Sequence, residues 1–175
     1  IVAAGGIVLF SSATLPDSVI NLIKYECELL SLDGDYIIDL PVPNVKKEVE
    51  IKYVNKPIEE AECEKGSIIF VNTIDRARRV YERCNGKSDV KILHSLMRKK
   101  DRDSVVGSLL NTSTVLIATQ AAEVGIDYDF EKVITEVAPI DSLIQRFGRV
   151  RKSEIEAEVY EIENSLPYDD DVVNR

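Results

Sequence analysis

The sequence is poor in the residues that bind metals or form disulfide frameworks, and it has no long apolar run. Its 175 residues include three cysteines and one histidine. Cys27, Cys63 and Cys84 are far apart, form no C-x-x-C pair and are odd in number, so we expect small core residues rather than metal ligands or a closed disulfide set. No stretch approaches the roughly 20 apolar residues of a membrane helix, and no targeting segment is recognised. These absences favour a soluble protein of a reducing cytoplasm.

Acidic residues outnumber basic ones, 31 to 22, but the positive charge is concentrated. The net charge of −9 by itself disfavours a polyanionic partner. Residues 75–103 nevertheless hold ten Lys and Arg against five acids, whereas residues 153–175 hold one Arg against eight acids. One face of an acidic protein can therefore be basic, and a nucleic-acid partner stays open.

Short apolar runs and helical periodicities alternate along the chain. Residues 7–10 have the pattern of a buried strand, and a helix follows up to residue 30. Gly34, Pro41 and Pro43 then indicate a linker. The later pattern predicts strands at 49–53, 67–71, 90–93, 114–118, 132–135 and 157–162, and helices at 73–84, 99–110 and 140–147. We expect three parts: residues 1–44, an α/β domain over 45–165 with a parallel sheet covered on both faces, and an acidic tail over 166–175.

Four cations fall within seven residues where the last predicted helix ends. Residues 145–152 read Q-R-F-G-R-V-R-K. A solvated basic face would explain the cations alone. It would not explain Gly148 between two arginines, or Gln145 on the side of an apolar helix. Guanidinium groups projecting at such a turn suit the spread negative charge of a transferring γ-phosphoryl group.

Five segments, in this order, resemble the motifs of superfamily 2 helicases. They are Ser12-Ala13-Thr14 for the third motif, 67–73 for the fourth, 94–102 for an L-H-x-x-x-x-x-x-R segment, 118–127 for the fifth and 145–152 for the sixth. The A-T-Q start, the D-Y-D-F turn and the T-E-V-A-P-I-D-S-L-I-Q-R-F-G-R run are similar to those of the CRISPR-associated helicase-nuclease of type I systems. The resemblance implies a C-terminal RecA-like domain, preceded by a remnant of the first RecA-like domain.

On the ATP side, the resemblance implies that Arg149 is the arginine finger that reaches the γ-phosphate. Gln145 and Arg146 would arrange the finger or couple it to the neighbouring domain. Asp127 would accept a hydrogen bond from the ribose, and Gly125 would let the backbone approach the nucleotide. The cofactors implied are ATP and Mg²⁺, bound mainly by the first domain.

On the nucleic-acid side, the resemblance implies a sequence-independent grip on a single DNA strand. The residues implied in it are Asn72, Thr73, His94, Thr119 and Gln120. Those implied in coupling hydrolysis to strand movement are Ser12, Ala13 and Thr14. The partners implied are single-stranded DNA, the first RecA-like domain, an RNA-guided surveillance complex and a nuclease domain or subunit.

Several residues have plainer interpretations. A lone histidine after an apolar strand is more often structural than catalytic, so His94 is expected to contact the strand or to pack. The acids at 123, 127 and 129 could pass for a metal cluster, but no cysteine or second histidine is near, and we expect no metal. For the basic run 98–102, a solvated helix face, strand binding and contact with the first domain all stay open. Lys152 stands where the family has a last arginine, so a second finger is in doubt.

The residues that bind the phosphates of ATP are missing. No G-x-x-x-x-G-K-[ST] occurs, no D-E-x-H precedes Ser12, and no H-D pair of the family's nuclease is present. We therefore expect that this chain alone does not hydrolyse ATP. Two alternatives stay open: the second domain of another superfamily 2 helicase acting on RNA or in DNA repair, and a non-catalytic RecA-like interaction module.

Overall fold

The computed structural model describes residues 17–29, 48–86, 89–109, 113–123, 126, 128–162 and 167–168. The chain divides into two compact units, Ile1–Asn44 and Val45–Arg175. In the first unit, α1 (Asp17–Leu29) begins directly after Pro16. The predicted strand over residues 7–10 lies outside the described residues, so the origin of the first unit in an upstream motor domain stays a prediction.

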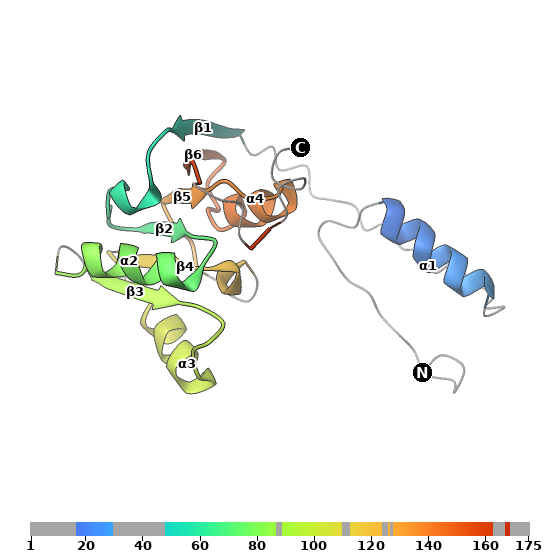
Figure 1. Cartoon of the computed structure of the whole chain (residues 1–175), viewed down its shortest axis with the longest axis horizontal. Coiled ribbons are helices and arrows are strands. Elements are labelled where there is room, and N and C mark those ends of the chain that lie inside the picture. Colours follow the sequence, from blue (N-terminus) through green and yellow to red (C-terminus); the bar gives the residue numbers. More distant parts are fainter. Residues whose placement is uncertain are drawn as a thin grey trace. The chain divides into compact units, whose positions relative to one another are not determined.

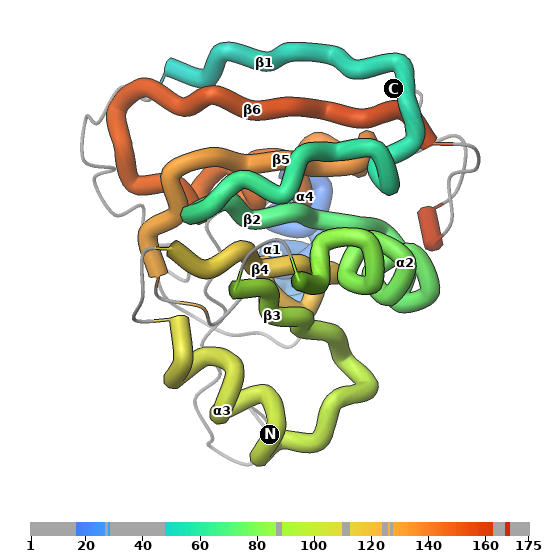
Figure 2. The backbone as a smooth tube through the Cα atoms, turned by 90° about the vertical axis from the view of Figure 1, so that its left-hand side faces the viewer, coloured from blue at the N-terminus to red at the C-terminus, as the bar shows by residue number. Residues whose placement is uncertain are grey.

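The second unit is built on a six-stranded sheet in the order β1-β6-β5-β2-β4-β3 (Figures 1 and 2). Every pair of neighbouring strands is parallel. The strands are β1 (Glu48–Val54), β2 (Ser67–Phe70), β3 (Val90–Leu93), β4 (Val115–Ala118), β5 (Lys132–Glu136) and β6 (Glu154–Tyr160). The helices are α2 (Ile74–Cys84), α3 (Lys99–Ser108) and α4 (Ile140–Phe147), with short 3₁₀ turns η2 (Ile58–Glu60) and η3 (Gln120–Ala122). The parallel α/β fold predicted from the sequence is confirmed.

Apolar side chains on both faces of the central strands account for this arrangement. All four residues of β2 are buried, and so are all four of β4. Successive residues point to opposite faces: Ile68 belongs to a cluster that Phe147 of α4 packs against, and Ile69 to a second cluster that contains Ala77 of α2. Helices therefore cover both faces of the sheet, as a buried parallel sheet requires.

The last strand, β6, does not have the predicted bounds. β6 begins at Glu154, three residues before the predicted start at 157, and pairs along its whole length with the edge strand β1. Its first half alternates exposed glutamates with buried Ile155 and Ala157. A search for a continuous apolar run misses such a strand, because only one of its two faces is buried there.

Two of the three cysteines form a disulfide, which corrects the expectation of unpaired core cysteines. Cys63 and Cys84 are joined, with a Cα–Cα distance of 5.8 Å. Cys63 precedes β2 and Cys84 ends α2, and a helix that returns antiparallel to its strand ends beside the start of that strand. The pairing thus depends on the βα return and not on sequence spacing. It also removes the cysteine-based argument for a reducing compartment.

Breaking this disulfide is expected to lower the free energy of unfolding by about 3 kcal/mol, the loss of loop-closure entropy for a loop of roughly 20 residues. Denaturant unfolding of the chain with and without reductant measures this loss of free energy. The Cys63→Ser variant should match the reduced protein and should not respond to reductant. An unchanged unfolding midpoint in reductant, with both thiols alkylated, would contradict the prediction.

Candidate nucleotide and nucleic-acid site

The carboxyl ends of three strands carry most of the described site residues that the sequence predicts. Asn72 and Thr73 follow β2, His94 follows β3, and Thr119 and Gln120 follow β4. Backbone hydrogen bonds tie these loops together, since Val71 donates to the carbonyl of Ala118 (2.9 Å) and Thr119 to that of Leu93 (3.1 Å). The structure therefore brings residues of distant motifs together at the carboxyl ends of the strands, where α/β folds bind ligands.

Arg146 of α4 lies among the loops at these carboxyl ends and is completely buried. Its side chain has 0% exposure, and its Cζ lies 5.3 Å from the centre of the Phe70 ring. Nε donates to Oε1 of Glu123 at 2.8 Å, which pairs the buried cation with a carboxylate that is itself 8% exposed. A buried arginine requires such a partner, because an unpaired charge in the interior is very costly.

The remaining N–H groups of Arg146 are also used. Nη1 donates to Oγ1 of Thr135 (2.8 Å) and to the carbonyl of Glu136 (3.3 Å). Nη2 donates to Oδ1 of Asn72 (3.2 Å) and to the hydroxyl of Tyr168 (3.1 Å). With the bond to Glu123, all five N–H donors of the guanidinium have acceptors. In this arrangement Arg146 has no donor left for a phosphate.

The polar groups of Asn72 also form hydrogen bonds with other residues of the chain. Its side chain accepts from Arg146 and donates from Nδ2 to the carbonyl of Val137 at 2.8 Å, and the residue is 2% exposed. Its backbone N–H donates to the carboxylate of Glu136, which also pairs with Arg76. Burial raises the pKa of Glu136, although these donors oppose the shift. A phosphate contact from Asn72 would have to replace one of these bonds, and its predicted role stays a prediction.

Arg149 is held differently from Arg146. It follows α4 in the turn that begins at Gly148, where an added Cβ would meet the carbonyl oxygens of Gln145 and Ile144 at 3.2 and 3.3 Å. Nη1 donates to the carbonyl of Ile126 at 2.6 Å, and Nη2 donates to the carbonyl of Glu123. Nε is buried and has no hydrogen-bond partner among the described residues. The guanidinium is thus held by two main-chain carbonyls, and its bonds to described residues use one of the two N–H groups on each Nη.

The other predicted contact residues have varied surroundings. Thr73 caps α2, its hydroxyl accepting from the N–H of Arg76 at 3.3 Å. Thr119 is 3% exposed, whereas Gln120 is half-buried and donates from Nε2 to the hydroxyl of Tyr168 at 3.0 Å. Gln145 is half-buried on α4. The hydroxyl of Tyr168 thus bridges the fifth and sixth motif segments, a contact from the expected tail that the sequence did not indicate.

His94 is a buried side chain. It is 8% exposed, and its Nδ1 has no hydrogen-bond partner among the described residues. Burial lowers the pKa of His94, and the positive charge of Arg78 lowers it further. Both causes disfavour the imidazolium form, so electrostatic attraction to a phosphate is not what this histidine offers near neutral pH.

Some predicted residues cannot be located. Gly125 and Asp127, and also Ser12, Ala13 and Thr14, lie outside the described residues. The two described acids of the alternative metal cluster are engaged elsewhere: Glu123 pairs with Arg146, and Oδ1 of Asp129 accepts from the N–H of Arg151 at 2.7 Å. Within the described part of the chain, no group of three or more His, Cys, Asp or Glu side chains is placed to hold a metal ion, and no helix is long and apolar enough to cross a membrane.

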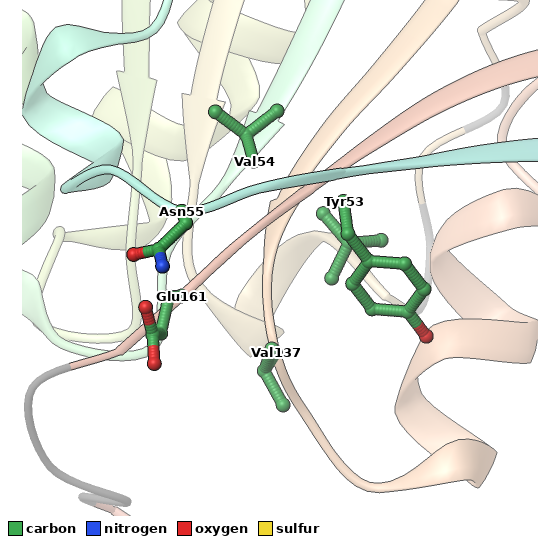
Figure 3. Close-up of a pocket in the computed structure, with 6 residues that line it drawn as sticks. Tyr53, Val54, Asn55, Val137 and Glu161 are labelled. Atoms are coloured by element: carbon green, nitrogen blue, oxygen red, sulfur yellow. The ribbon is translucent and has the colours of Figure 1, made fainter.

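An open pocket lies at the carboxyl ends of β1 and β6 (Figure 3), and its lining residue Val137 accepts a hydrogen bond from Asn72. It is lined by Tyr53, Val54, Asn55, Val137, Val159 and Glu161. None of the residues predicted from the sequence lines it. Its one charged lining residue, Glu161, would repel a phosphate, so the pocket is not a candidate for the nucleotide site.

Comparison with known proteins identifies the family. The model described as CRISPR-associated nuclease/helicase Cas3, C-terminal, matches residues 64–154. The chain belongs to this Cas3 family. It is 40% identical over 176 aligned residues to a CRISPR-associated helicase Cas3 of Thermoproteus tenax, which covers 95% of this chain. The chain spans only 30% of that relative's length.

Solved structures agree on the fold. The crystal structure of T. fusca Cas3-ADP has a TM-score of 0.58 and 20% identity, covering 74% of this chain and 20% of that one. A chain of a CRISPR RNA-guided surveillance complex in a pre-nicking state has a TM-score of 0.55 and 21% identity, covering 74% of this chain and 21% of that one. The resemblance to the CRISPR-associated helicase-nuclease inferred from the motifs is confirmed.

Glu123 is the functional candidate that sequence reasoning missed in this Cas3-family chain. It entered only as a metal-ligand alternative, because a carboxylate in a motif segment gives no sign of its partner. The sequence did carry one indication of a buried position for Glu123: it lies in a segment rich in small residues, four residues before Asp127. A charged residue there needs a buried counter-ion, and the sixth motif supplies one in Arg146.

Proposed function

We propose that this chain is the second motor domain of an ATP-dependent Cas3-family DNA helicase, and that Arg149 is its arginine finger. One observation carries the proposal: the Arg149 guanidinium is held by the carbonyls of Glu123 and Ile126, and these bonds use only one of the two N–H groups on each Nη. Catalysis of phosphoryl transfer depends on donors that are already positioned where charge develops. A finger that is held before the nucleotide arrives meets this requirement.

The buried pair Arg146–Glu123 supports the same proposal, because it fastens α4 to the loop that holds Arg149. ATP and Mg²⁺ would be bound mainly by a first RecA-like domain of the longer protein, with Gly125 and Asp127 completing the nucleotide site from this side. T. fusca Cas3 has been solved with ADP, which agrees with a nucleotide ligand. This chain alone would not hydrolyse ATP, because it lacks the phosphate-binding loop.

Single-stranded DNA is the proposed track, along which the motor would move in the 3′ to 5′ direction. Its phosphates would be bound by Thr119 and by the main chain around Asn72 and Thr73, with His94 and Gln120 beside them. Ser12, Ala13 and Thr14 would couple hydrolysis to movement. A similar chain occurs in a CRISPR RNA-guided surveillance complex, so we propose recruitment by such a complex in the cytoplasm, and action beside a nuclease domain or subunit.

The experiment is ATP hydrolysis by the full-length parent with single-stranded DNA, RNA or no nucleic acid. Turnover is expected to rise with DNA and to respond less to RNA. The Thr119→Ala variant should need more DNA for half-maximal stimulation at an unchanged KM for ATP. Preferential stimulation by RNA would favour another superfamily 2 helicase, and intact ATPase in the Arg149→Ala and Asp127→Ala variants would favour an interaction module.

A further inference from the structure

Glu123 is the one described residue that accepts hydrogen bonds from both Arg146 and Arg149 of the sixth motif. Its carboxylate Oε1 accepts from Nε of Arg146 at 2.8 Å, and its main-chain carbonyl accepts from Nη2 of Arg149. Oε2 lies 3.4 Å from the hydroxyl of Ser142, one helical turn earlier in α4. The side chain of Glu123 therefore contacts α4, and its main chain contacts Arg149 just after α4.

The loop that begins at Glu123 is fixed to the end of α4 at further points. Phe130 donates its N–H to the carbonyl of Arg149 at 3.3 Å, and Asp129 accepts from the N–H of Arg151 at 2.7 Å. These contacts lie at the far end of the loop. At its near end, the side-chain link among the described residues is that of Glu123 to α4, so the near end depends on the ion pair with Arg146.

We infer that Glu123 is a positioning residue for Arg149. The carboxylate is held by Arg146, whose other four N–H bonds anchor it to β5, Asn72 and Tyr168. That anchor fixes the backbone at residue 123 and hence the carbonyl that holds one Nη of Arg149. Removing the charge of Glu123 loosens this carbonyl and lets the guanidinium leave its orientation.

The inference rests on the proposed role of Arg149. A displaced catalytic group slows the chemical step and leaves substrate binding alone, and displacements of about 1 Å can cost on the order of 10²-fold in rate. Loss of a positioning contact should therefore lower kcat without changing the KM for ATP or the DNA requirement. A merely structural role would lower the amount of folded protein and the midpoint of unfolding, with unchanged kcat per folded molecule.

The test uses the full-length parent with saturating ATP and single-stranded DNA. Glu123→Gln keeps the size of the side chain and an acceptor for Arg146, and we expect kcat to fall roughly 10-fold or more at unchanged KM. The matched control is Glu158→Gln on β6, which removes another poorly exposed carboxylate. That carboxylate is ion-paired with Lys132 at 3.0 Å, and its contacts with described residues are to Lys132, Lys52 and Tyr160, not to Arg146 or Arg149. The control should keep kcat within about twofold.

A double-mutant cycle separates positioning from destabilisation. If Glu123 acts through Arg149, adding Glu123→Gln to Arg149→Ala should change kcat by less than about twofold. A further full-size loss in that background, or an unchanged kcat in the single variant, would overturn the inference. If Arg149→Ala alone leaves turnover intact, the proposed function fails instead.

A second variant covers the case in which Glu123→Gln folds poorly. Replacing both partners, as Glu123→Met with Arg146→Met, removes the buried charges together and avoids leaving either one unpaired. The folded double variant should still lose roughly 10-fold or more in kcat. Wild-type kcat in that variant would also overturn the inference.

Discussion

Arg149→Ala in the full-length parent is expected to lower ATP turnover by about 10³-fold or more, the range in which arginine fingers act. The guanidinium would contribute mainly when charge spreads over the transferring phosphoryl group, so kcat should fall far more than the KM for ATP changes. Steady-state kinetics with saturating single-stranded DNA measure both constants.

Two variants make this result specific. Arg149→Lys keeps the positive charge but lacks the planar fork that donates to two carbonyls and a phosphate together, so we expect it to recover little of the lost rate. Arg79→Ala removes an exposed arginine of α2 that pairs with Asp75 and Glu59, and it should leave turnover near wild type. Full activity in Arg149→Ala would remove Arg149 from the reaction.

Arg146→Met is expected to lower the free energy of unfolding of the chain by about 3 to 5 kcal/mol. The substitution keeps an unbranched apolar stem against Phe70 but leaves the buried carboxylate of Glu123 without its cation. Four other acceptors also lose a donor. Denaturant unfolding monitored by circular dichroism measures the loss.

The matched control for this loss is Arg79→Met, because exposed ion pairs contribute little. The side chain of Arg79 is 52% exposed, and we expect its removal to cost less than about 1 kcal/mol. Removing both charges, as Glu123→Met with Arg146→Met, should recover part of the stability lost in the single variant. Equal costs for Arg146→Met and Arg79→Met would contradict the buried network.

The parallel sheet could be predicted because its central strands are continuous apolar runs. Residues 67–71 and 114–118 are apolar almost throughout, and the two strands formed there are buried at every position. The octet at the end of α4 could be found because cations, a glycine and a glutamine recur there at motif spacing. The local sequence pattern was enough to predict the central strands and to find the octet.

The partners of individual side chains could not be predicted. The octet looks like an exposed basic turn, yet Arg146 is completely buried, because its counter-ion Glu123 comes from a loop 23 residues earlier in the sequence. Tyr168 contacts Gln120 across 48 residues. Cys63 meets Cys84 only through the return of α2 along β2. Each pairing is produced by the topology, on which sequence spacing carries no information.

The most direct test of the central claim mixes this chain with a separately produced first RecA-like domain and measures ATP hydrolysis with and without single-stranded DNA. We predict DNA-stimulated turnover only in the mixture, and its loss when the chain carries Arg149→Ala. To allow for the missing covalent link, the two halves are also joined in one polypeptide. Turnover in the joined protein that is indifferent to Arg149→Ala would contradict the account.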